Sequence, residues 1–88
     1  MDDRIFERSL KALANGRRLS IMRLLKKEKE LSVTEIAEEI KLSFRSTSRH
    51  LAVLSAAEIV EREQRSLQVF YRVQDPLLKV VRSVLSLL

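Results

Sequence analysis

The chain has 88 residues, which is enough for one small domain and too few for two. Its 17 lysines and arginines against 12 aspartates and glutamates give a net charge of +5, which suits a nucleic-acid partner but also describes an ordinary basic surface. The absence of cysteine excludes disulfides, thiolate metal sites and a cysteine nucleophile, and it fits a reducing cytosol.

No stretch has the pattern of a signal peptide or of a membrane-spanning helix. The most apolar region, residues 76–88, contains Lys79 and Arg82 and is too short to cross a bilayer. We therefore expect a cytoplasmic protein with no membrane partner.

The first half of the chain has the spacing of two helices. Asp2 or Asp3 can cap a first helix over about residues 3–14, and Asn15-Gly16 ends it. Asn15 is then the expected cap of a second helix. The charged run at 26–30 is typical of a solvated turn after that helix.

A pair of helices separated by a short turn follows. Ser32 and Glu35 have the spacing of a capping box, which predicts a third helix from Val33 to about Ile40. Ser43 then caps a fourth helix over residues 43–57, giving a helix-turn-helix whose second member would enter a major groove of DNA.

The segment 43–57 separates into two faces at helical spacing. One face is predicted to pack inward, with Thr47, Leu51 and Leu54, while Arg45 and Arg49 lie on the other. No carboxylate occurs between Glu39 and Glu58, so a polyanion could approach this helix without repulsion. We interpret the segment as a DNA recognition helix.

After Ala57 the apolar period changes from helical to alternating. Residues 59–64 and 67–73 are rich in β-branched and aromatic side chains and flank Arg65-Ser66, which predicts an antiparallel hairpin. A hairpin after a helix-turn-helix is a wing, and we expect its tip residues Gln64, Arg65 and Ser66 to contact a phosphate or a minor groove.

The last segment predicts a helix from Pro76 nearly to the end, capped by Asp75. It is apolar on more than one face, which favours a homodimer interface formed with the first helix. The alternative is that this helix only closes the core of one chain. The expected interface residues are Ile5, Phe6, Leu10, Leu78, Val81, Leu85 and Leu88.

The sequence therefore predicts one mainly α domain over residues 1–88, with a small β-hairpin in the order α-α-α-α-β-β-α. Its terminal helices, about 3–14 and 76–88, would form the dimer interface. The residues expected to contact DNA are Lys41, Ser43, Phe44, Arg45, Ser46, Ser48, Arg49, Gln64 and Arg65.

Two aromatic side chains near this surface allow alternatives. Phe44 could touch a thymine methyl group or pack locally at the helix start, and we favour local packing. His50 is the only histidine, and we interpret it as a hydrogen-bonded residue bordering the core. No pair of groups has a spacing useful for catalysis, so we do not expect an enzyme or a cofactor.

Three segments, taken together, resemble the ArsR family of winged-helix repressors. They are Leu13–Leu19 at the junction of the first two helices, Leu42–Leu51 in the recognition helix, and Val69–Val73 in the second strand. The resemblance covers almost the full chain. It implies a homodimer on a pseudo-palindromic operator, with the two recognition helices about 34 Å apart in successive major grooves.

This sequence departs from that family in its metal ligands and its glycines. Ser32 and Thr34 stand where metal-sensing members carry a cysteine pair, and residues 75–88 hold no histidine, so we expect no metal site. Lys41, Glu58 and Arg65-Ser66 stand where glycine is frequent. Either these positions keep a left-handed backbone at about 1 kcal/mol each, or the turns have changed shape.

We conclude that the sequence predicts a sequence-specific regulator of transcription that binds double-stranded DNA. We expect a homodimeric repressor on a prokaryotic nucleoid. The alternatives are an architectural protein that coats DNA with low specificity, and a winged helix that contacts protein or RNA.

Overall fold

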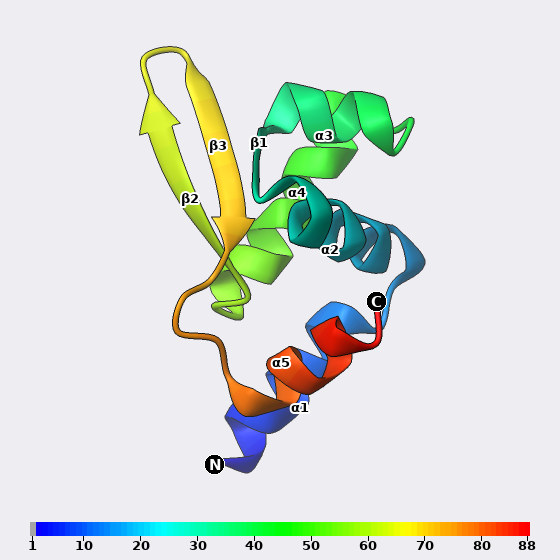
Figure 1. Cartoon of the computed structure of the whole chain (residues 1–88), viewed down its shortest axis with the longest axis vertical. Coiled ribbons are helices and arrows are strands. Elements are labelled where there is room, and N and C mark those ends of the chain that lie inside the picture. Colours follow the sequence, from blue (N-terminus) through cyan, green and yellow to red (C-terminus); the bar gives the residue numbers. More distant parts are fainter. Residues whose placement is uncertain (1) are drawn as a thin grey trace.

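The computed structural model describes residues 2–88 and places a short three-stranded sheet beside a set of helices. The helix-turn-helix and the hairpin lie at one end of the long axis, and the two terminal helices lie at the other (Figure 1). In chain order the elements are α1 (Asp3–Leu13), α2 (Gly16–Glu28), β1 (Glu30–Ser32), α3 (Val33–Glu39), α4 (Phe44–Ala56), β2 (Val60–Arg65), β3 (Gln68–Val73) and α5 (Lys79–Ser86). The predicted fold class is confirmed.

The first four helices start at their predicted capping side chains. Asp2 accepts a hydrogen bond from the Arg4 amide at 2.7 Å, and Asn15 accepts one from the Arg18 amide at 3.1 Å. At α3 both bonds of the capping box are present, because Glu35 N–H donates to Ser32 Oγ at 3.1 Å and Ser32 N–H donates to Glu35 Oε1 at 2.8 Å. These local signals place α3 and therefore the turn before α4.

The inner face of α4 lies in the middle of the core, as its spacing predicted. Leu51 and Leu54 are fully buried and pack among Ile21 of α2, Ile36 of α3 and Tyr71 of β3. Apolar side chains of this size each stabilise the folded chain by about 1.5–3 kcal/mol when buried. The core thereby fixes which side of α4 faces outward.

The sheet has an element that the sequence did not predict. Its antiparallel order is β1-β3-β2, with Glu30 opposite Arg72. The predicted solvated turn over 26–30 is wrong, because α2 continues to Glu28 and Glu30 already begins β1. Lys29 makes the change of direction possible with a φ of 71°.

The hairpin turn is one residue further along the chain than predicted. Arg65 pairs with Gln68 across the hairpin, so Ser66 and Leu67 form the two-residue turn. Ser66 has a φ of 56°, and the two-residue turns that usually close hairpins need a positive φ at their first central residue. Arg65 therefore belongs to β2, and Leu67 lies at the tip instead of in a strand.

The left-handed positions settle the question of the missing glycines. Lys41, Glu58 and Ser66 have φ values of 55°, 59° and 56°, so these turns keep the backbone that glycine usually supplies. The first of the two alternatives is therefore confirmed, with Ser66 as the turn residue concerned.

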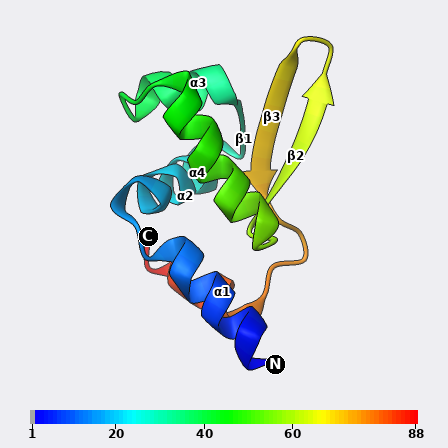
Figure 2. The same cartoon turned by 180° about the vertical axis from the view of Figure 1, so that it is seen from behind.

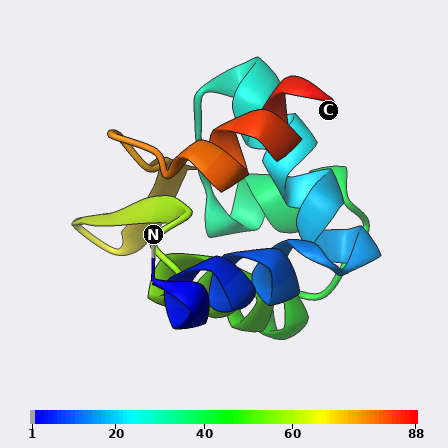
Figure 3. The ribbon, with the colours of Figure 1, turned by 90° about the horizontal axis from the view of Figure 1, so that it is seen from below.

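The last helix begins later than predicted. Leu78 is its N-cap and makes no side-chain cap hydrogen bond, so Asp75 and Pro76 lie in the preceding connection. Leu77 and Leu78 are packed against the core in this connection, which explains why the helix starts only at Lys79. Seen from below, α5 and α1 form the near end of the molecule (Figure 3), and the two helices are in contact.

Within residues 2–88, no helix has both the length and the apolar character needed to span a membrane.

Candidate nucleic-acid interface

The outer face of α4 is a bare cationic surface. Ser43 Oγ accepts a hydrogen bond from the Ser46 amide at 3.1 Å and so starts the helix, as predicted. Arg45 and Arg49 are exposed and make no hydrogen bond or ion pair with residues 2–88. Ser48 is half-exposed between them. Figure 2 shows that α4 crosses the face of the molecule without another element covering it.

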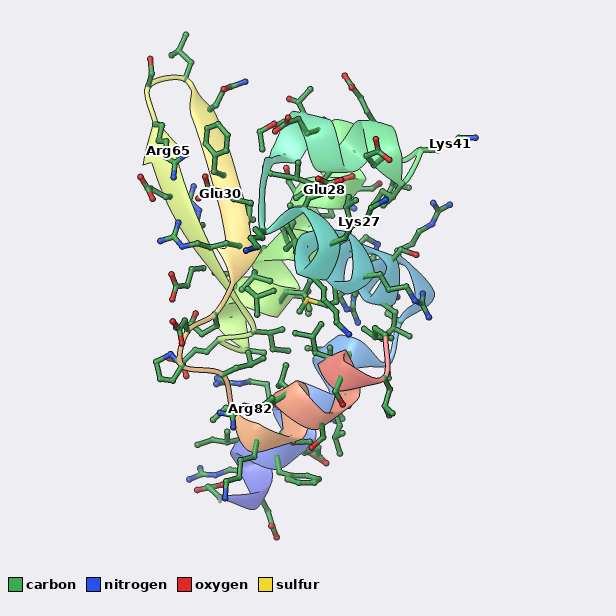
Figure 4. All side chains as sticks on the ribbon, viewed as in Figure 1. Lys27, Glu28, Glu30, Lys41, Arg65 and Arg82 are labelled. Carbon is green, nitrogen blue, oxygen red and sulfur yellow. The ribbon has the colours of Figure 1, made fainter. Side chains whose placement is uncertain are left out.

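The turn before α4 adds a further cation. Lys41 is exposed, and its side chain projects away from the fold (Figure 4). The turn is held by Leu42 N–H, which donates to Ala37 O at 3.0 Å, and by Arg17 Nη1, which donates to Ile40 O at 3.0 Å. Sequence reasoning missed Arg17, because nothing local indicates that a residue of α2 reaches the end of α3.

Phe44 does not pack locally. Its side chain is 59% exposed at the first position of α4, so the preferred interpretation of local packing is wrong. The aromatic ring instead lies on the same open end of the helix as Ser43 and Arg45.

His50 borders the core, as predicted. Arg18 Nη1 lies 3.2 Å from His50 Nδ1, and because the guanidinium can only donate, this ring nitrogen is the acceptor. Burial first, and then the charges of Arg18 and Arg17, lower the pKa of His50 below 6.5. Arg18 also donates to Ala12 O, so it joins α4 to the junction of α1 and α2.

The outer face of the sheet carries arginines whose charges are compensated. Arg65 donates from Nη1 and Nη2 to the two carboxylate oxygens of Glu30, each at 2.8 Å, and from Nε to Glu63 at 2.9 Å. Arg72 bonds Glu61 at 3.1 Å, Glu63 at 3.1 Å and Glu30 at 3.2 Å. Arg65 and Glu30 lie together on the hairpin side in Figure 4.

These contacts change the proton affinities of the carboxylates. Hydrogen bonds from Arg65, and then from Arg72, lower the pKa of Glu63 to about 2. The pKa of Glu30 is lowered too, mainly by its hydrogen bond from Arg65. Arg65 was predicted at the wing tip as a DNA contact, but its guanidinium is already occupied within the chain.

The inner face of the hairpin carries an arginine that has no such partners. Arg62 lies on the same face of β2 as Val60 and Gln64, because every second residue of a strand points to the same side. Val60 packs in the core. Arg62 is exposed and makes no hydrogen bond or ion pair within residues 2–88. Sequence reasoning missed it, although the alternation from Val60 could have placed it on the face that packs against α4. Gln64 is exposed near the tip, as predicted, and bonds Ser66 O at 3.4 Å.

The terminal helices leave apolar side chains in solvent. Ile5, Phe6 and Leu10 are 39%, 43% and 41% exposed, and Leu87, which was not predicted, is 84% exposed. The expected interface residues Leu78, Leu85 and Leu88 are half-buried. Val81 is fully buried within the chain, so its prediction as an interface residue is wrong.

A helix-turn-helix followed by a β-hairpin defines a winged helix-turn-helix domain. Residues 15–62 match the bacterial regulatory proteins of the arsR family. The chain therefore belongs to the ArsR family, and the predicted resemblance is confirmed.

Relatives with a named role in transcription are similar in sequence to this chain over most of its length. The transcriptional activator HlyU of Vibrio cholerae is 37% identical over 76 residues, which cover 86% of this chain and 69% of HlyU. The transcriptional repressor PagR of Bacillus anthracis is 30% identical over 77 residues, covering 88% and 77%. The structure of reduced HlyU superimposes with a TM-score of 0.82 and 33% identity, covering 97% of this chain and 85% of that one.

A solution structure from Mycobacterium bovis bears on assembly. It is described as a homodimeric winged helix-turn-helix DNA-binding domain, and it matches with a TM-score of 0.80 and 31% identity over 94% of this chain and 73% of its own.

The side chains at the family's metal position do not fit a metal. Ser32 is buried and its oxygen is taken by the capping box of α3, while Thr34 offers only an exposed hydroxyl. Among residues 2–88, no group of three or more histidine, cysteine, aspartate or glutamate side chains is arranged to hold a metal ion.

Proposed function

We propose that this protein is a sequence-specific transcriptional regulator that binds double-stranded DNA through the outer face of α4. The observation that carries the proposal is that Arg45 and Arg49 are exposed and unpaired within residues 2–88 on a helix that has no acidic residue. A helix of this kind fits the major groove, where arginine can bond guanine edges or phosphates.

Lys41, in the turn before α4, and Arg62, on the strand β2 that contacts α4, are two further exposed cations. Ser43, Ser46 and Ser48 add short hydroxyl groups beside the arginines of α4. Phe44 is open enough to contact a thymine methyl group. Gln64 would reach the DNA from the wing.

The protein acts as a homodimer through α1 and α5. Ile5, Phe6 and Leu10 leave an apolar face in solvent, and a small domain rarely leaves such a face uncovered. The Mycobacterium bovis relative is described as homodimeric, which supports a dimer of this chain. Two copies related by a two-fold axis would read an operator with two-fold symmetry in successive major grooves.

Repression by occlusion of a promoter is the mode that we propose. It needs only a bound dimer, and PagR is named as a transcriptional repressor. HlyU is named as an activator, so the position of the operator relative to the promoter would set the sign of regulation. Such a protein works on the bacterial nucleoid, without a metal sensor, because Ser32 and Thr34 cannot supply thiolate ligands.

The test begins with duplexes selected from a random pool by the full chain. Arg45→Ala with Arg49→Ala should weaken binding to the selected duplex by about 30-fold or more, since a base contact is worth roughly 1–3 kcal/mol. Lys79→Ala with Arg82→Ala removes two exposed cations of α5, the helix at the opposite end of the molecule (Figure 1). This matched control should bind nearly as the wild type does.

Competition with bulk DNA separates this proposal from the alternatives. A specific regulator keeps the selected duplex in the presence of excess random DNA at physiological salt, whereas an architectural coat releases it. If the double arginine variant binds as tightly as the wild type, α4 is not the reading helix and a protein or RNA contact becomes the better interpretation.

The dimer has its own test. Phe6→Asp with Leu10→Asp should convert the purified protein to a monomer in sedimentation and weaken operator binding, because the two half-sites are no longer linked. Unchanged sedimentation would place the interface elsewhere.

A further inference from the structure

The tip of the hairpin has one bare apolar side chain and no charge. Leu67 is 98% exposed, and its neighbours Ser66 and Gln68 are uncharged. A single exposed leucine is common on protein surfaces and carries little meaning alone. The strands that carry this turn, however, are tied together in an unusual way.

Arg65 braces the end of the hairpin to the opposite side of the sheet. It starts from β2, passes over the Phe70 ring of the central strand β3 with 4.6 Å between the guanidinium carbon and the ring centroid, and bonds both oxygens of Glu30 on β1. The contacts therefore cross all three strands. A two-stranded hairpin is marginally stable alone, so this brace fixes the direction in which the tip projects.

The brace also removes the outer face of the wing from electrostatic binding. The two arginines there, Arg65 and Arg72, face three carboxylates from Glu30, Glu61 and Glu63. The cluster as a whole is not positive, so it would release no counterions from a phosphate backbone. A wing contact made by the tip must then be an uncharged one.

From these observations we infer that Leu67 is an apolar minor-groove contact of the wing, and that Arg65 is the positioning residue that holds it there. The inference rests on the proposed DNA-binding function and assigns the chemistry of its second contact. The minor groove is about 6 Å wide and is walled by sugars, and apolar side chains are known to enter it. Such a contact adds affinity and sensitivity to groove shape without adding salt dependence.

The experiment measures the affinity of full-length variants for one selected duplex over a range of salt concentrations. Leu67→Ala should weaken binding about three- to tenfold at every salt concentration and leave the slope of log affinity against log salt unchanged. Leu67→Met keeps the apolar surface and should bind within about twofold of the wild type. Because Leu67 is in solvent, its variants should melt as the wild type does.

Arg65 and Arg62 form a matched pair on opposite faces of the same strand. Arg65→Ala combined with Glu63→Gln keeps the net charge of the cluster unchanged, so this pair of changes should weaken binding with an unchanged salt slope. Arg62→Ala should reduce the slope by about 0.9 per protomer, because a free cation near phosphate is lost. Adding the same two changes to Leu67→Ala should cost little more, since Arg65 acts through Leu67.

Two results would overturn the inference. One is a Leu67→Ala variant that binds like the wild type, and the other is an Arg65→Ala, Glu63→Gln variant whose slope falls as that of Arg62→Ala does. The first would remove the apolar contact, and the second would make Arg65 a phosphate contact. Both leave the Arg45 and Arg49 result untouched, whereas failure of the wild type to bind any duplex would refute the proposed function itself.

Discussion

The outer face of α4 and the outer face of the sheet each present two arginines, yet they use them in opposite ways. On α4, Arg45 and Arg49 are four residues apart on one helix face with no acid nearby. On the sheet, Arg65 shares its strand face with Glu61 and Glu63, because alternate residues of a strand point the same way. The net charge of the chain does not distinguish these two surfaces.

This difference shows which of the exposed arginines are free to bind a polyanion. The helix leaves its arginines open, so they can neutralise a polyanion, while the sheet uses its arginines to hold strands together. Two kinds of variant would test this difference most directly: those that remove a free cation from α4, and those that free the arginines of the sheet.

The largest effect is expected from reversing one charge on α4. Arg49→Glu should weaken binding to a selected duplex by at least about 100-fold at moderate salt, because a carboxylate would face phosphate where a cation is expected. Since Arg49 is exposed and unpaired among residues 2–88, the thermal unfolding of the variant should match that of the wild type. Binding that survives the reversal would show that the open arginines of α4 do not face DNA.

A smaller effect is expected from freeing the arginines on the outer face of the sheet, so that they are unpaired like those of α4. Glu30→Gln with Glu63→Gln releases Arg65 and Arg72 from two of their three carboxylates. Affinity for random duplex DNA at low salt should rise about tenfold, with a steeper salt dependence. Fluorescence anisotropy with a duplex of scrambled sequence measures this. Glu28→Gln with Glu38→Gln, which removes two exposed carboxylates from α2 and α3, is the control for net charge. Unchanged affinity would mean that the outer face of the sheet lies far from bound DNA.

Each of the two surfaces lies next to a turn with a left-handed residue, Lys41 before α4 and Ser66 at the hairpin, and a glycine should act differently at each. Lys41→Gly and Ser66→Gly both relieve a left-handed backbone and should raise the free energy of unfolding by about 1 kcal/mol. Lys41→Gly should in addition weaken DNA binding a few-fold, since it removes a cation next to α4. Urea unfolding and the same binding assay check both effects, and a destabilised Ser66→Gly would contradict the turn geometry.

Local signals predicted most of what positions α4. The caps at Asp2, Asn15, Ser32 and Ser43 involve groups two or three residues apart, and the structure has all of them. The two faces of α4 likewise follow from helical spacing alone. A sequence holds such information directly, because the interacting groups are close along the chain.

The missed features depend on partners that are far apart in sequence. In the sequence, Glu30 belongs to a charged run that predicts a turn. In the structure it lies in β1 opposite Arg72, and it accepts hydrogen bonds from Arg65 and Arg72, which follow it by 35 and 42 residues. The turn at Ser66 and Leu67 lacks the glycine or asparagine that usually marks one. Val81 belongs to an apolar helix, and only packing decides which of its side chains face inward.

The smallest expected effect is on the acid stability of the wing, where the pKa of Glu63 is about 2 and that of Glu30 is also lowered. Carboxyls of the unfolded chain titrate near pH 4.5, so between about pH 4.5 and 2 the unfolded state binds more protons than the folded state. The contribution of Glu63 to stability is therefore fully present above pH 4.5 and is lost as the pH falls through this window. Urea unfolding between pH 5 and 2.5 should show a shallower decline for Glu63→Gln than for the wild type, because the amide has no proton to gain. Identical declines would mean that the ion pairs of the wing do not persist in solution, and Leu67 would then lose the support on which its proposed contact depends.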